Sequence, residues 1–273
     1  MLYTSEQLLD YKTYTFAHLL LEEKEHLLTL TLNRPEKLNA LTKPMWKLLG
    51  EVMRELSAAD GLRCIVIRGA GDKSFAPGND ISEFADARAN SAQAQAYGEI
   101  HHAALSALHG CRHPTMALIK GICVGGGLEI AVLCDLRVCG TSSRFGIPIN
   151  RLGLVAGYGE IQALLALVGW SVTLEILLEG RVFGAEEALQ KGLVNRLVAD
   201  DKVEEEAYAT AQRIADGAPL VARWHKKFIR RLADPTPLTD QERNEGYACY
   251  DTEDFKTGYQ SFLAKTKPEF RGR

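Results

Sequence analysis

The chain has 273 residues, of which 46% are hydrophobic, enough for one substantial core with at most a small appended lobe. Its 32 lysines and arginines nearly balance its 35 aspartates and glutamates, and the net charge is −3. This balance gives no general electrostatic reason to expect nucleic acid or an acidic membrane as the main partner, and a small ligand is favoured instead.

The six cysteines lie mostly in apolar runs, without a CxxC pair or the spacing of a metal site. We therefore expect reduced core residues, no bound metal and a cytoplasmic location. Residues 1–16 lack a basic segment followed by an apolar stretch, so no targeting leader is expected. No run is expected to reach the roughly 18 apolar residues of a membrane helix.

The first half of the chain alternates between strand and helix patterns. Residues 26–32 have β propensity and stop before Pro35, and a helix follows from Thr42, a favourable N-cap, with Pro44 in its first turn. Strand–helix alternation predicts an α/β fold. Further short apolar strands are expected at 64–71, 115–121 and 136–140.

After about residue 160 the strand signal fades into helical patterns. No low-complexity linker and no internal repeat is evident. We predict a core over residues 1–200 and a helical C-terminal region over 201–273. The helical patterns cover 162–168, 172–178, 185–191, 203–216, 221–232 and 244–265.

Three consecutive glycines, 125–127, stand directly before a helix pattern whose first turn carries Glu129. Glycines let the backbone approach a ligand closely, and the first amides of a helix have no intrahelical partner, which favours an anion. The spacing fits neither phosphate-binding fingerprint, so tight helix–strand packing is the alternative. Glu129 is a candidate base, or simply an acid that complements the helix dipole.

A second glycine turn lies in SFAPGNDISEF, residues 74–84. Asp80 is expected as an N-cap, with Glu83 completing a capping box, which makes Asp80 most simply structural. Two such turns can each supply one backbone N–H to the same oxygen, as needed to hold a carbonyl that becomes an oxyanion or enolate. Periodicity does not tell whether the two turns meet.

Six blocks of sequence follow one another in an order typical of one family. They are LNRPEKLNALT (32–42), SFAPGNDISEF (74–84), IKGICVGGGLEIAVLCDLRV (119–138), SRFGIPINRLGLVAGYG (143–159), GRVFGAEEALQKGLVNRLV (180–198) and FLAKTKPEF (262–270). On these blocks the chain resembles the crotonase superfamily, also called the enoyl-CoA hydratase/isomerase family, over nearly its whole length. The resemblance implies a spiral of ββα units and a helical C-terminal region for trimerisation, giving a trimer or a dimer of trimers.

The resemblance also implies an acyl-CoA or enoyl-CoA substrate, with coenzyme A as part of the substrate and no separate cofactor. It assigns the oxyanion-hole amides to Asn79 and Gly126. It places Lys37 beside the nucleotide, and Phe262 and Lys265 against the adenine and phosphates, although a solvated surface role is the alternative for both lysines. The full set expected to contact CoA or the thioester is Lys37, Ala76, Gly78, Asn79, Asp80, Ile81, Gly125, Gly126, Phe262 and Lys265.

The carboxylates depart from the family pattern, in which one glutamate activates water and another exchanges a proton at the α-carbon. Glu129 matches the first, but Ile149 occupies the position of the second and cannot transfer a proton. Glu160 begins the next predicted helix and is a candidate catalytic residue that reaches the pocket, or simply a helix N-terminal acid. Catalysis by His101 or His102 is not expected, because the family motif does not require it.

The sequence thus predicts an enoyl-CoA hydratase/isomerase-type enzyme with Glu129 as the main acid/base. A single-base pocket is expected to hydrate crotonyl-CoA poorly and to favour isomerisation. Decarboxylation, C–C bond cleavage and hydrolysis remain open, because Ile149 makes the site less polar. A weakly catalytic CoA-thioester binding protein is a second class, and RNA binding by the basic cluster 223–231 is a third. The acyl group is not identified.

Overall fold

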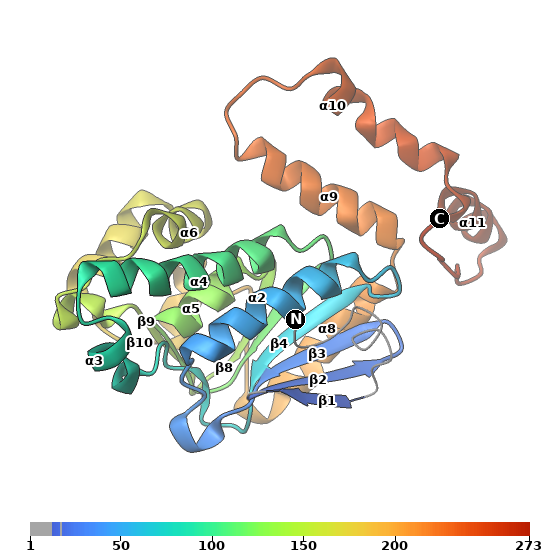
Figure 1. Ribbon diagram of the computed structural model, residues 1–273. Coiled ribbons are helices and arrows are strands. Elements are labelled where there is room, and N and C mark those ends of the chain that lie inside the picture. Colours follow the sequence, from blue (N-terminus) through green and yellow to red (C-terminus); the bar gives the residue numbers. More distant parts are fainter. Residues whose placement is uncertain (1–12, 17) are drawn as a thin grey trace.

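Two sheets and the helices packed on them form the body of the computed structural model, which describes residues 13–16 and 18–273 (Figure 1). The larger sheet has the order β1-β2-β3-β4-β6-β8-β11 and the smaller one β10-β9-β7-β5. The expectation that no leader is present falls largely on residues 1–12, outside the described residues. The strands are β1 (Thr13–Phe16), β2 (Leu19–Lys24), β3 (Leu27–Leu32), β4 (Cys64–Gly69), β5 (Ser74–Ala76), β6 (Thr115–Ile119), β7 (Ile122–Val124), β8 (Leu136–Gly140), β9 (Arg144–Gly146), β10 (Phe183–Gly184) and β11 (Arg196–Val198).

The helices fill the intervals between the strand pairs and make up most of the last third of the chain. The α-helices are α2 (Lys43–Ala58), α3 (Phe84–Ala87), α4 (Ser91–Gly110), α5 (Gly126–Leu133), α6 (Tyr158–Glu179), α7 (Ala185–Gln190), α8 (Val203–Ala215), α9 (Pro219–Leu232), α10 (Asp240–Asn244) and α11 (Glu253–Ala264). The 3-10 helices are η1 (Pro35–Lys37), η2 (Ile81–Glu83), η3 (Pro148–Leu152), η4 (Asp200–Lys202) and η5 (Glu245–Asp251).

From β4 to β9, consecutive strands alternate between the two sheets. In each of the pairs β4/β5, β6/β7 and β8/β9, the first strand joins the larger sheet and the second joins the smaller one. The larger sheet is parallel from β3 through β11, whereas β1, β2 and β3 form an antiparallel meander. This is the spiral of ββα units predicted by the family resemblance, and it brings the ends of successive strands to one edge.

The alternation of side chains in β4 shows how the larger sheet is buried on both faces. Ile65 and Ile67 belong to the main core, which includes α2, α4 and α5, whereas Cys64 and Val66 belong to a second cluster under α8. The continuous apolar strands expected from the sequence are therefore confirmed. The N-cap of α2 is also confirmed, because the Thr42 hydroxyl accepts a hydrogen bond from the Met45 amide.

Three sequence predictions about the C-terminal half are wrong. The single helix expected over 244–265 is interrupted by extended backbone at Thr252 (φ −82°, ψ 152°), which caps α11. The short strands β10 and β11 were not expected after residue 160. Finally, α6 is long and apolar enough to span a membrane by length and composition alone, although non-helical backbone at Gly169 (φ 75°, ψ 175°) breaks it into two segments.

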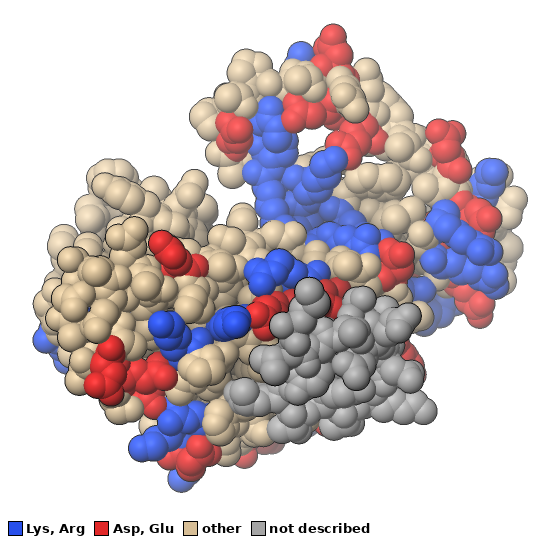
Figure 2. All heavy atoms as spheres, viewed as in Figure 1, with Lys and Arg blue, Asp and Glu red and all other residues tan. Residues whose placement is uncertain are grey.

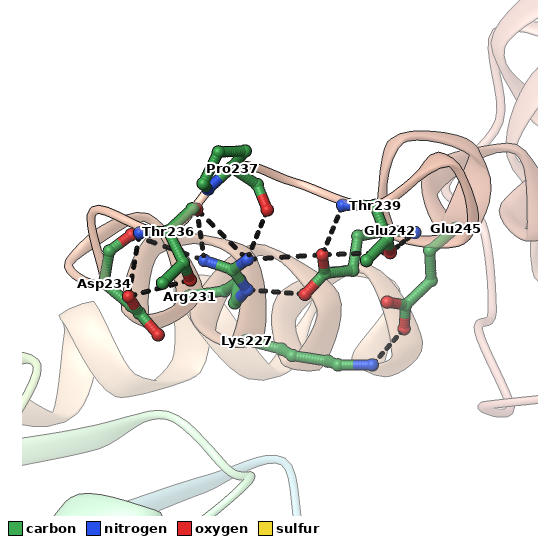
Figure 3. Close-up of polar contacts among 8 residues, drawn as sticks. All are labelled: Lys227, Arg231, Asp234, Thr236, Pro237, Thr239, Glu242 and Glu245. Atoms are coloured by element: carbon green, nitrogen blue, oxygen red, sulfur yellow. Dashed lines mark hydrogen bonds and ion pairs between the residues drawn. The ribbon is translucent and has the colours of Figure 1, made fainter.

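The C-terminal arm, which we define as α9 to α11 (residues 219–264), stands clear of the two sheets as two antiparallel runs (Figure 1). Figure 3 shows Arg231 at the turn between the runs, where it pairs with Glu242 and donates to the carbonyls of Thr236 and Pro237. By contrast, α8 packs directly on the larger sheet. The division into parts at residue 200 stays a prediction.

A buried lysine ties the arm to the core. Lys226 of α9 is 8% exposed, and its Nζ lies 2.5 Å from Asp135 Oδ2 and donates to the His113 carbonyl at 2.6 Å. We expect Lys226→Met to lower the free energy of unfolding by about 1.5–3 kcal/mol, the range for a hydrogen-bonded charged group left without its partner. Denaturant unfolding measures this. Lys227→Met, which breaks an exposed pair with Glu245, should cost about 1 kcal/mol or less; equal losses in both variants would contradict the role of Lys226.

Candidate active site

The two glycine turns meet, which the sequence alone left undecided. Strands β5 and β7 are parallel neighbours, so their carboxyl ends lie at the same edge of the smaller sheet. Gly78 follows β5 with φ +104°, and a Cβ built on it would lie only 2.9 Å from the backbone nitrogen of Gly126. Gly125 (φ +52°) turns the chain between β7 and α5. Glycine is needed at Gly78 both for its backbone angle and for the close approach.

The amides of Asn79 and Gly126 are available to a ligand. The Gly78 carbonyl accepts a hydrogen bond from the Leu41 amide, and the Asp80 amide donates one to the Leu41 carbonyl. The Asn79 N–H lies between these two hydrogen bonds and takes part in neither. Gly126 is the first residue of α5, where an amide has no intrahelical acceptor. Within residues 13–16 and 18–273, no backbone carbonyl accepts from either N–H. The two N–H groups therefore stand on neighbouring turns, and their role as an oxyanion hole stays a prediction.

Trp46 of α2 contacts both turns and the interior behind them. Its indole Nε1 donates to Asn79 Oδ1 at 2.6 Å, and its ring lies against the position that a Gly126 side chain would occupy. The other edge of the indole faces His101, with ring centroids 4.3 Å apart and planes 83° apart. Trp46 is fully buried. It thereby fixes the position of Asn79 relative to His101.

Three ionisable side chains from three helices form a buried acidic cluster, which we define as His101, Glu129 and Glu160. His101 Nε2 lies 3.1 Å from Glu129 Oε2, and His101 Nδ1 lies 3.2 Å from Glu160 Oε1. The side chains are 4%, 11% and 10% exposed, respectively. His102, which is 53% exposed, also approaches Glu160 Oε1, at 3.3 Å. Two carboxylates thus lie beside the same imidazole, and whether only one of them acts as a base stays a prediction.

The local sequence explains why Glu160 points inward. Gly157 is the N-cap of α6, and its amide donates to Glu160 Oε2; glycine has no side chain to return the bond, so only this half of a capping box forms. The second oxygen of the same carboxylate is left to face His101. Glu160 is therefore a helix N-terminal acid that also reaches the cluster, and its catalytic role stays a prediction.

The electrostatics of the cluster favour a charged imidazole. Burial alone lowers the pKa of His101, but the two neighbouring carboxylates outweigh this effect and raise it to about 9. For Glu160, burial raises the pKa, and His101 together with the Gly157 amide outweighs it, so the net pKa is lowered. The cluster is thus expected to hold an imidazolium between carboxylates at neutral pH.

A small cavity of about 10 Å³ lies beside the cluster, close to the least volume that holds one water molecule. Glu129 and Glu160 are its two acidic residues, and the rest of its lining is apolar: Leu105, Val132, Leu133, Ile147, Ala163 and Leu164. A larger hollow of about 460 Å³ lies near the C-terminus, between Arg63 and Lys267, and contains none of these groups. The small cavity is therefore the one that the two carboxylates share.

The predicted CoA contacts near the first glycine turn lie together. The isolated bridge between Leu41 and Asn79 brings η1, which ends at Lys37, next to this turn. Ile81 is 58% exposed at the same place. Asp80 is engaged by Ser82 and by Arg34, whose Nη1 lies 2.6 Å from Oδ2, and these contacts lower its pKa to about 2.

The capping box expected between Asp80 and Glu83 does not form. Asp80 accepts from the Ser82 amide, and Glu83 accepts from the Lys43 amide instead. The reason is that the segment after Asp80 is a 3-10 helix, η2, in which the third residue is turned toward α2. The structural role of Asp80 is supported by its ion pair with Arg34.

The other predicted contacts are placed differently. Ala76 is buried at the end of β5. Its carbonyl lies so close to Gly127 that a side chain there would clash with it, so Ala76 packs against the second glycine turn. Phe262 (84% exposed) and Lys265 lie at the end of α11 in the C-terminal arm, away from the glycine turns (Figure 1). Within one chain they are not brought to the site, and their contact with CoA stays a prediction.

Ile149 lies in η3 and packs partly buried against the main core, so no carboxylate occupies the position of the second family glutamate. The residue that sequence reasoning missed is His101. A signal was available, because Tyr97, His101, Ala104, Leu105 and Leu108 are the buried residues of α4 and recur at helical spacing. His101 lies on this buried face, and the neighbouring His102 lies outside it.

The fold and site define an α/β enzyme in which backbone amides and buried carboxylates converge at the end of parallel strands. The family model described as enoyl-CoA hydratase/isomerase matches residues 22–273. A short-chain-enoyl-CoA hydratase from Clostridium acetobutylicum is 32% identical over 94% of this chain and 98% of its own, and an (E)-benzylidenesuccinyl-CoA hydratase from Thauera aromatica is 34% identical over 92% and 98%.

Among solved structures, an enoyl-CoA hydratase/carnithine racemase from Magnetospirillum magneticum superposes with a TM-score of 0.94, at 46% identity over 97% of this chain and 98% of that one. The chain belongs to the enoyl-CoA hydratase/isomerase family, which is the crotonase superfamily. It is an enzyme of the enoyl-CoA hydratase/isomerase type.

Proposed function

We propose that the protein adds water to the double bond of a 2-enoyl-CoA, or removes it in the reverse direction. The thioester oxygen would accept from the Asn79 and Gly126 amides, and Glu129 would be the main acid/base. The observation that supports this most is the meeting of the two glycine turns, with Gly78 in contact with the Gly126 nitrogen. Glu129 is one helical turn beyond, its own amide bonded to the Gly125 carbonyl.

In this proposal the charges develop where the protein has placed donors. Glu129 takes a proton from water as the water oxygen bonds to C3, and the electron pair of the double bond moves toward the thioester oxygen. The resulting enolate is stabilised by the two amides. The proton held by Glu129 then passes to C2, which regenerates the carboxylate. The water-sized cavity lined by Glu129 and Glu160 supports a water molecule held between the two acids.

Isomerisation is the second candidate reaction. Glu129 alone can carry one proton between two carbons on the same face of an enolate, and the apolar Ile149 beside the core supports a site without a second acid at that turn. Decarboxylation, C–C cleavage and hydrolysis use the same amides, and the experiment below separates them.

A panel of acyl- and enoyl-CoAs, read by mass spectrometry, tests the proposal. Hydration adds the mass of one water, isomerisation keeps the mass and moves the double bond, decarboxylation loses carbon dioxide, and hydrolysis releases free CoA thiol. We expect hydration of at least one enoyl-CoA. Turnover of no thioester by a protein that still binds CoA esters would contradict the proposal and support a binding protein.

We also propose that the chain self-associates as a homotrimer or a dimer of trimers, as the family resemblance implies. Support comes from large apolar side chains left exposed on the C-terminal arm, including Ile229 (71%), Leu232 (67%), Phe262 (84%) and Leu263 (75%). Sedimentation at micromolar concentration should give a mass of at least three chains. A stable monomer of 30.1 kDa would contradict this proposal.

The cytoplasmic location stays part of the proposal. All six cysteines are free and five are buried, which suits a reducing compartment.

The basis for RNA binding is weaker than the sequence suggested. The basic side chains along α9 gather where the arm meets the core (Figure 2), and all five are engaged within the chain: Arg223, Lys226, Lys227, Arg230 and Arg231.

A further inference from the structure

The acidic cluster raises an electrostatic problem that the proposed reaction does not by itself solve. Glu129 and Glu160 are each about nine-tenths buried beside a cavity whose remaining lining is apolar. Two carboxylates so placed repel each other, and a buried unpaired charge is costly. A cation between them is required if both are to stay ionised.

The groups that face this cluster leave one candidate for that cation. Helix α4 contributes His101 and the exposed His102, α5 contributes Glu129, α6 contributes Glu160, and α2 contributes the neutral Trp46. Among the residues that the structure describes, His101 is the buried group in contact with both carboxylates. Its Nε2 and Glu129 Oε2 have no hydrogen-bond partner despite their 3.1 Å separation, so the contact is one of charge and not of a well-aligned bond.

We propose that His101 is a positioning residue whose imidazolium holds Glu129 and Glu160 ionised beside one water-sized cavity, so that Glu160 supplies the second carboxylate that Ile149 does not. This inference rests on the proposed function. His101 does not line the cavity, and it acts through the two glutamates. The second acid thus comes from the first turn of α6, not from the turn after β9.

The geometry favours this role over a metal ion bound by the same three side chains, which are close enough together to consider one. Glu129 faces Nε2 and Glu160 faces Nδ1, on opposite edges of the ring. The ligand atoms of the three side chains nevertheless lie within 4.8 Å of one another, so elemental analysis for a divalent metal is part of the test below. A doubly protonated imidazole instead places one positive charge within about 3 Å of both carboxylates.

The proposal predicts a specific pH dependence. In the wild type, kcat should fall at high pH as His101 loses its proton, since its pKa is raised to about 9. Toward low pH the imidazolium opposes the protonation of Glu160, whose pKa is lowered by His101. In His101→Gln the carboxylates face each other without a cation, so one of them binds a proton more readily. The decline of kcat on the acid side of the pH profile, the acid limb, therefore moves to higher pH.

The first experiment measures kcat and KM against pH for the wild type, His101→Gln and His109→Gln, an exposed histidine on the same helix. We expect His101→Gln to lose about 10- to 100-fold in kcat at neutral pH, less than the roughly 10²- to 10⁴-fold of a group that transfers the proton itself, because His101 acts through the two glutamates. KM should change little. In the pH profile of kcat, the acid limb should move up by about one pH unit, and the decline on the alkaline side should disappear. A uniform loss with both limbs unmoved would show a merely structural role and overturn the proposal.

The second experiment does not depend on activity, and so separates this inference from the proposed function. Imidazole NMR follows the titration of His101 in the wild type and in Glu160→Gln. We expect the wild-type midpoint well above the ordinary histidine value of about 6.5, and a lower midpoint in the variant. A wild-type midpoint at or below the ordinary value, or a divalent metal bound at one per chain by elemental analysis, would overturn the proposal even if the enzyme is active.

Discussion

Glu129→Gln should reduce turnover of the best acyl-CoA substrate by about 10²- to 10⁴-fold, the usual contribution of one positioned general base. Glutamine has nearly the same shape, so the first turn of α5 and the cavity should be preserved, but an amide cannot take a proton from water. The loss should appear in kcat more than in KM, because in the proposed mechanism the thioester oxygen is bonded by backbone amides that the substitution does not touch. Steady-state kinetics on the wild type and the variant measure both parameters.

Glu99→Gln is the matched control for that substitution. Glu99 is exposed on α4, so the same chemical change there should leave turnover within about twofold of the wild type, as expected for a surface position. If Glu129→Gln retains full activity, Glu129 is not the base. Glu160→Gln then tests the other carboxylate. Loss of activity in that variant would make Glu160 the base, whereas no loss in either variant would favour a binding protein.

The strands and the first helix could be predicted because their signals are local. Continuous apolar runs such as β4 and β6 are buried on both faces, and Thr42 with Pro44 marks the start of α2 whatever the rest of the chain does. Strands β10 and β11 could not be predicted in this way. They have two and three residues, and their strand structure depends on pairing with β9 and β8, which lie far from them in sequence.

The candidate site likewise has features that the sequence predicts locally and features that depend on distant contacts. The two glycine turns were evident in the sequence, but their meeting depends on the parallel pairing of β5 with β7, which no local pattern encodes. Glu160 was recognised as an acid at a helix start, and its approach to His101 depends on how α6 packs against α4. The family pattern directed attention to Ile149 and away from His101, although the helical spacing of α4 places His101 on its buried face.

Gly78→Ala should abolish most of the activity, with kcat/KM lower by about 10²- to 10³-fold, the cost of losing one oxyanion donor. The new methyl group would lie 2.9 Å from the Gly126 nitrogen, close to the amide that the proposed mechanism assigns to the thioester oxygen. Alanine also disfavours the φ of +104° at this position, so the turn that carries the Asn79 amide would shift. Both effects act on the same two donors.

Gly71→Ala separates the loss of the oxyanion donors from backbone strain alone. Gly71 also has a positive φ (+73°), but a Cβ there meets no atom within 4 Å, so this variant has a strained backbone without an obstructed amide. We expect Gly71→Ala to lose stability in thermal unfolding while retaining its turnover. Gly126→Val tests the other turn, because its Cβ would press on the Trp46 ring at 3.0 Å and displace the second donor. If folded Gly78→Ala and Gly126→Val both turn over substrate normally, the thioester oxygen is not held by these amides, and the proposed enolate mechanism fails with them.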